Sequence, residues 1–191
     1  MSQADHQRLL DEALVVEAEG HRALLAGDAE GARALLADAA RRYRASWDAA
    51  PPTAFGRLVG LMKDAVLAGE ARDAVAVVRG ALGDDAESPT AAWALAIAAL
   101  ADGDDALTRR AAQRMRAGGE AFARTADAVT ALADGDEEVY ARALLGIVAD
   151  FEGRAAHLTG VPIADTALLL ERLAEPRGLA VHPHSPVLPG P

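Results

Sequence analysis

Leu132-Ala133-Asp134-Gly135-Asp136 is one of four places where the chain joins two helix-like stretches through a glycine followed by an acidic residue. Glycine tolerates the left-handed backbone that ends a helix, and the following acid can cap the next helix and meets the positive end of its dipole. Each pair therefore predicts a turn between two helices. The other three stretches are Leu25-Ala26-Gly27-Asp28, Leu67-Ala68-Gly69-Glu70 and Leu100-Ala101-Asp102-Gly103-Asp104.

The spacing of the turns predicts the architecture. The four glycines lie 42, 34 and 32 residues apart, close to the length of one helical hairpin plus its connection. Apolar side chains recur at helical spacing after each turn, and no segment alternates apolar and polar residues over the length of a strand. The cleanest stripe is Tyr140, Leu144, Ile147, Val148 and Phe151. We therefore expect an all-α chain of four antiparallel helical hairpins.

A ninth helix and a tail are expected to complete the chain. Pro162 opens and Pro176 closes a helical stretch from about Ile163 to Glu175. Residues 181–191 contain four prolines, which favour extended backbone. We expect one helical-repeat domain over residues 1–180, with Val187 and Leu188 docking the tail onto it.

Composition limits the classes of function. The 191 residues carry a formal net charge of −10, which argues against general affinity for nucleic acid or anionic membranes. The chain lacks cysteine, so thiolate nucleophiles and Cys-ligated zinc are excluded. The sequence has no apolar run of membrane-spanning length and no secretory signal pattern at its start. These features predict a cytoplasmic protein.

Catalytic motifs are missing from the sequence. It contains no Gly-x-Ser-x-Gly elbow, His-Glu-x-x-His pair, phosphate loop or dinucleotide-binding glycine fingerprint. His21 lies on an apolar helical stripe, which predicts a hydrogen-bonded core histidine. We expect a protein without catalytic activity, metal ion or cofactor.

The repeated hairpins resemble a tetratricopeptide-type array. Ala32 and Ala74 stand five residues after their turn glycines, where such arrays carry a small side chain. The resemblance implies a concave groove that binds a protein or peptide partner. Arginine side chains favour forked contacts with the carboxylates of such a partner. A homodimer is also possible, in which the alanine-rich helices pack against a second copy of the chain. The candidate partner-binding residues are Arg109, Arg110, Arg114, Trp93 and Trp47.

Residues 131–189 resemble the end of the polymorphic-toxin immunity protein 49 family. The similarity rests on ALADGDEEVYARALLGIVADFEGR and on GLAVHPHSPVLP. It implies a protein that neutralises a toxin by direct binding. The chain departs from the family where a basic and aromatic cluster is expected, because Glu152, Gly153, Arg154 and His157 stand there.

A third hypothesis is a small enzyme or metal-binding protein that uses residues near His157. Glu152, Arg154 and His157 lie close in sequence to Asp165, at the entry to the ninth helix. Asp150 and Arg154 are four residues apart and can pair at the end of a helix. We also expect a buried ion pair between Arg154 and Asp165 to fix the ninth helix. A closed pocket holding His157 and two carboxylates would favour this hypothesis, whereas an open groove lined by arginines or aromatic residues would favour peptide binding.

Overall fold

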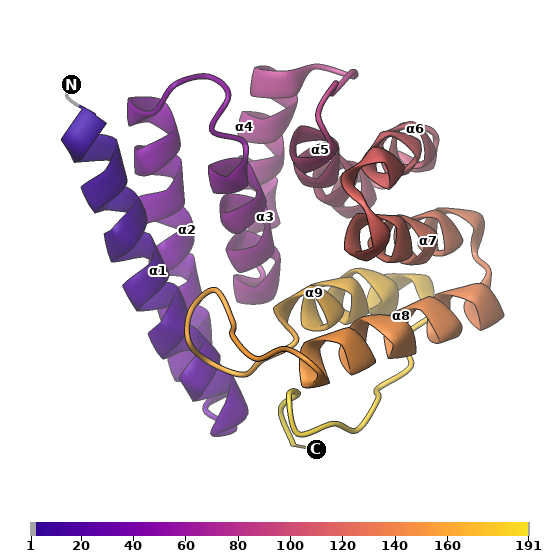
Figure 1. Ribbon diagram of the computed structural model, residues 1–191. Helices are drawn as coiled ribbons and strands as arrows, with labels where there is room; N and C mark the ends of the chain where they lie inside the picture. Colours follow the sequence, from indigo (N-terminus) through magenta and orange to yellow (C-terminus); the bar gives the residue numbers. More distant parts are fainter. Residues whose placement is uncertain (1–2, 191) are drawn as a thin grey trace.

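The computed structural model describes residues 3–190, and within that range the chain forms nine α-helices, two 3₁₀ turns and no strand (Figure 1). The predicted all-α class is confirmed. Met1, Ser2 and Pro191, which belong to the predicted domain and tail, lie outside the described residues. The α-helices are α1 (Gln3–Leu25), α2 (Ala29–Ala49), α3 (Gly56–Ala68), α4 (Ala71–Leu82), α5 (Pro89–Asp102), α6 (Asp105–Met115), α7 (Glu120–Asp134), α8 (Glu137–Glu152) and α9 (Asp165–Ala174).

The four predicted turns lie where the glycines stand. All four glycines have the left-handed backbone, with φ values of 77° at Gly27, 79° at Gly69, 77° at Gly103 and 70° at Gly135. Three of the acids that follow accept a hydrogen bond from a backbone N–H in the first turn of the next helix: Asp28, Asp104 and Asp136. The predicted side-chain cap is wrong at Glu70, which makes no such bond, since glutamate is not among the favoured capping residues.

Helix α5 lies at the centre of the core. Its ten residues from Ala91 to Leu100 are all buried, and six of them are alanine. Small side chains let neighbouring helices approach on every face, so α3, α4, α6 and α7 all pack against it. This explains why the helix shows no single apolar stripe in the sequence.

The chain after α8 returns to the first helices. Figure 1 shows α9 beside α8, and α9 also contacts α3. The segment 153–164 between α8 and α9 passes next to α1, where Val161 and Ile163 are buried against Ala18. Val187 and Leu188 are buried too, and the backbone N–H of Ala164 donates to the Val187 carbonyl. The α8–α9 segment is therefore held against helices from the opposite end of the sequence.

The limits of α9 differ little from the expected range of Ile163 to Glu175. The helix runs from Asp165 to Ala174, and a 3₁₀ turn over Glu175–Arg177 follows it. Asp165 is thus the first residue of the helix. None of the helices in the described range is both long and apolar enough to cross a membrane.

Candidate functional site

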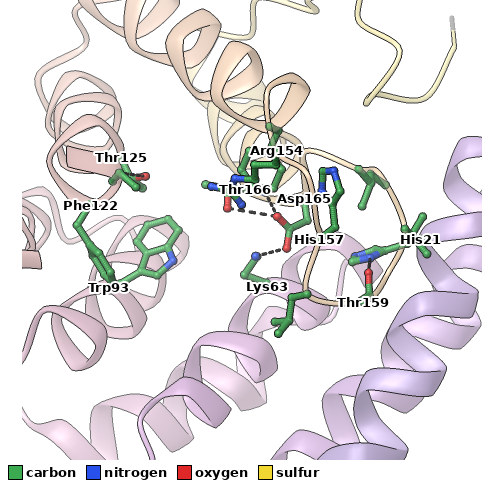
Figure 2. Close-up of a pocket in the computed structure, with 15 residues that line it drawn as sticks. His21, Lys63, Trp93, Phe122, Thr125, Arg154, His157, Thr159, Asp165 and Thr166 are labelled. Atoms are coloured by element: carbon green, nitrogen blue, oxygen red, sulfur yellow. Dashed lines mark hydrogen bonds and ion pairs between the residues drawn. The ribbon is translucent and has the colours of Figure 1, made fainter. Parts of the chain in front are cut away.

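The candidate site is a cavity of about 210 Å³ bordered by α1, α3, α5, α7 and the α8–α9 segment. Figure 2 shows Trp93 and Phe122 at one end of it and His21 with Thr159 at the other. Lys63 and Asp165 lie between them. The cavity therefore joins an aromatic wall to a polar wall, and the polar wall depends on how the α8–α9 segment is placed.

Lys63 and Asp165 form an ion pair inside this polar wall. The Lys63 ammonium donates to Asp165 Oδ2, and the two side chains are only 13% and 14% exposed. Burial opposes charge on both groups, but their mutual attraction outweighs it, so the pKa of Lys63 is raised and the pKa of Asp165 is lowered. The Thr166 backbone N–H also donates to Asp165 Oδ1, at 2.7 Å. Both members of the pair are charged at neutral pH.

Two further carboxyl groups lie near the same ammonium. The Tyr43 hydroxyl donates to Glu17 Oε2 at 2.6 Å, and burial raises the pKa of Glu17. Asp64 is fully buried, and neither of its oxygens has a hydrogen-bond partner in the described part of the chain. Burial, with the nearby charge of Glu17 as the next cause, raises the pKa of Asp64 well above its ordinary value. The ammonium of Lys63 is thus the shared counter-charge of three carboxyl groups, those of Glu17, Asp64 and Asp165.

A glycine makes the approach of Tyr43 possible. Tyr43 on α2 crosses α3 at Gly60, and a Cβ atom at Gly60 would lie 2.5 Å from the Cζ atom of the ring. A side chain at this position would therefore force the ring away. The glycine is needed for close helix packing, and this packing brings the Tyr43 hydroxyl to Glu17.

His21 places a neutral imidazole beside these groups. Its Nδ1 atom lies 3.2 Å from Thr159 Oγ1 in the α8–α9 segment, as the dashed line in Figure 2 shows. Burial lowers the pKa of His21 to about 4, so the ring is uncharged at neutral pH. Its Nε2 atom is buried without a hydrogen-bond partner among residues 3–190 and lies 3.9 Å from Glu17 Oε1. Only one of the two ring nitrogens of this predicted core histidine therefore has a hydrogen-bond partner in the described range.

His157 supplies a second imidazole to the cavity. Its Nδ1 atom is buried and lacks a hydrogen-bond partner in the described range. The ring lies beside Phe151, with 6.1 Å between the ring centroids. A buried polar atom without a partner is unusual in folded proteins, and two in one cavity indicate a place for a ligand or solvent.

The predicted ion pair between Arg154 and Asp165 is wrong. Arg154 Nη2 instead donates to Asp150 Oδ2 at 2.6 Å, one helical turn earlier, and its guanidinium lies over the Phe151 ring. The partner of Asp165 is Lys63 on α3, and residue spacing near Arg154 could not reveal a partner so distant in sequence.

The predicted polar cluster is only partly brought together. Arg154, His157 and Asp165 line the cavity. Glu152 does not, because it is exposed and accepts a hydrogen bond from Ser185 Oγ at 2.6 Å. The carboxyl groups that accompany Asp165 come instead from α1 and α3.

The predicted partner-binding residues do not share one surface. Arg109 donates to Asp134 and to the Ala133 carbonyl, while Arg110 and Arg114 border a separate hollow with acidic walls. Trp93 is buried in the cavity wall. Trp47 stacks on Phe55, with ring centroids 6.1 Å apart.

Sequence reasoning missed Glu17, Tyr43, Lys63 and Asp64. Two signals were present. Glu17 and His21 are one helical turn apart, and Lys63 is the one lysine among 19 basic residues. In the aromatic wall, Phe122 gave no signal, because it looks like an ordinary core residue at helical spacing, and Trp93 was expected on a partner-binding surface rather than in a cavity wall.

Comparison with protein-family models, curated proteins and solved structures gives no match for this chain. The function is therefore argued from the geometry of the site.

Proposed function

We propose that this protein binds a small aromatic carboxylate in the cavity between α1, α3, α5, α7 and the α8–α9 segment. The observation that carries the proposal is the His157 imidazole, whose Nδ1 has no partner among residues 3–190, in one cavity with the Lys63–Asp165 ion pair and an aromatic wall. Ligand sites in proteins combine apolar walls with a few polar groups of fixed orientation.

Two cationic side chains of the lining favour an anion. Lys63 and Arg154 line the cavity, although each also pairs with a carboxylate, Lys63 with Asp165 and Arg154 with Asp150. Their remaining N–H groups can donate to an anionic ligand. A carboxylate would accept hydrogen bonds from the groups of the polar wall.

The size and the aromatic wall favour a single ring. A volume of about 210 Å³ is smaller than the roughly 300–1,000 Å³ of sites for drug-sized ligands. Trp93, Phe122 and Phe151 supply ring faces and edges that stack well on another aromatic ring. Benzoate is therefore a suitable probe.

Trp93 can report binding directly. The variant Trp47→Phe keeps an aromatic ring against Phe55 and leaves Trp93 as the only tryptophan, inside the cavity. Titration with benzoate should give a saturable change in Trp93 fluorescence, and benzyl alcohol, which has no charge, should bind more weakly. No saturable change up to about 10 mM benzoate, the range of very weak binding, would contradict the proposal.

Two histidine variants localise the site. His157→Gln should weaken benzoate binding about tenfold, the effect of losing one hydrogen bond to a charged ligand. His184→Gln, outside the cavity, should leave binding unchanged. Equal effects of the two substitutions would place the ligand elsewhere.

For the scaffold we propose an array of four hairpins, α1–α2, α3–α4, α5–α6 and α7–α8, of tetratricopeptide type, followed by an extended Pro-rich tail. The left-handed turn glycines and the packing of successive helices support it. Binding of a protein or peptide, neutralisation of a toxin, a homodimer and a cytoplasmic location stay predictions. A partner that used Arg109 or Arg114 would compete with their ion pairs to Asp134 and Asp85.

A further inference from the structure

Three side chains at the polar end of the cavity have the arrangement of a metal site. Glu17 and His21 lie one turn apart on α1, and Asp165 begins α9. One ligand atom from each residue lies within 4.8 Å of the other two. One imidazole nitrogen with two carboxylate oxygens is a ligand set suited to zinc and related divalent ions.

His21 is oriented as a metal ligand would be. A metal-bound imidazole usually donates its other ring N–H to an oxygen, which fixes the ring. Here Nδ1 lies 3.2 Å from Thr159 Oγ1, and in the tautomer that donates from Nδ1 the lone pair is on Nε2. The side chain is 2% exposed, and Nε2 has no hydrogen-bond partner in the described chain, while Glu17 Oε1 lies 3.9 Å from it. The free nitrogen thus faces the carboxylate.

Hydrogen bonds from neighbouring residues also fix the orientation of the two carboxylates, those of Glu17 and Asp165. The Tyr43 hydroxyl holds Glu17 Oε2, which leaves Oε1 on the side of His21. Asp165 is held by the Thr166 backbone N–H and by the Lys63 ammonium. Outer hydrogen bonds of this kind orient metal ligands and strengthen binding.

The charges of the cluster leave room for a divalent cation. The cluster holds three carboxyl groups, those of Glu17, Asp64 and Asp165, but only one lysine, Lys63. Isolated charges are costly to bury, and a divalent cation would balance this excess.

His21 and Asp165 line the cavity, which gives an ion a path to the site. We propose that Glu17, His21 and Asp165 bind one divalent transition-metal ion, with Zn²⁺ as the ion that suits this ligand set. The site goes beyond the proposed carboxylate binding, because its three ligands do not include His157, on which that proposal rests.

Calorimetric titration of chelator-treated protein with Zn²⁺ tests the proposal. We expect one ion per chain with a dissociation constant of about 1 μM or tighter, and Co²⁺ should give a visible absorption band when it replaces zinc. His21→Gln and Asp165→Asn should each weaken Zn²⁺ binding at least tenfold. Absence of stoichiometric binding would overturn the proposal and would mean that Lys63 is the only cation the cluster accepts.

Matched variants separate this site from others. His157→Gln should weaken benzoate binding and leave Zn²⁺ binding unchanged, so failure of one proposal does not imply failure of the other. His184→Gln tests the tail, where His182 and His184 lie close in sequence. If His184→Gln abolished Zn²⁺ binding, the ion would belong to the tail and the proposal would be wrong.

A measurement on the unsubstituted protein covers the case in which the His21 variant does not fold. Nitrogen NMR of the imidazole rings should show one buried histidine with a proton on Nδ1, whose Nε2 resonance shifts on addition of one equivalent of Zn²⁺. A shift confined to exposed histidines, or no shift, would contradict the assignment.

Discussion

Replacing Lys63 by methionine tests the importance of the buried ion pair. Methionine has a similar length but no charge, so Glu17, Asp64 and Asp165 would lose their shared cation. Removal of one partner from a buried ion pair typically costs about 3–5 kcal/mol of unfolding free energy, because the other charge stays behind. For a chain of this length, such a loss lowers the unfolding midpoint by about 6–20 °C. Thermal and urea unfolding, followed by circular dichroism, measure both quantities.

An exposed pair provides the matched control. Arg44 and Asp48 form an ion pair one helical turn apart on α2, with side chains 44% and 53% exposed. Arg44→Met should cost less than about 0.5 kcal/mol, because water screens exposed pairs. The double variant Lys63→Met with Asp165→Leu should recover part of the loss, since it removes the stranded charge. If Lys63→Met cost no more than Arg44→Met, the pair would not stabilise the fold and the reasoning would be refuted.

Three further substitutions test individual contacts. Asp64→Leu should raise the unfolding free energy by about 1–3 kcal/mol in urea, because it removes a buried carboxyl group that has no hydrogen-bond partner among residues 3–190; a loss would show that the attraction of Lys63 outweighs the cost of burial. Gly60→Ala should lower it by about 1–3 kcal/mol through overlap with the Tyr43 ring, and an unchanged midpoint would show that the ring moves freely. Asp104→Ala should lose about 1 kcal/mol of capping, whereas exposed Asp102→Ala should change little. The backbone N–H that donates to Asp104 lowers the pKa of its carboxyl group. The stabilisation by this cap is therefore present above the pKa of the unfolded state and is lost as the pH falls through the pKa of the folded state. A stability difference between Asp104→Ala and wild type that persisted in acid would contradict this cause.

The fold class could be predicted because its signals are local. A glycine in the left-handed region followed by an acid specifies a turn and a cap within a few residues, and Gly27 with Asp28 shows both in the structure. The missing cap at Glu70 also has a local cause, because glutamate is not among the residues that favour the capping position. The apolar stripe that ends at Phe151 likewise predicted α8.

The site could not be predicted, because its contacts join distant parts of the chain. Lys63 and Asp165 are 102 residues apart, and His21 and Thr159 are 138 residues apart. Neither separation leaves a recognisable spacing. The sequence offered Arg154 two partners, and the one close in sequence, Asp150 near the end of α8, is the one it pairs with. Tertiary placement of the α8–α9 segment decides these contacts.

The lone lysine allows the most direct test of the account. In protein labelled with nitrogen-15 only at lysine, NMR reports one side-chain ammonium, that of Lys63. We expect a single resonance in slow exchange with water, because the ammonium is buried against Asp165, and a saturable shift of that resonance on addition of benzoate. A rapidly exchanging ammonium that does not respond to benzoate would contradict both the buried ion pair and the ligand site.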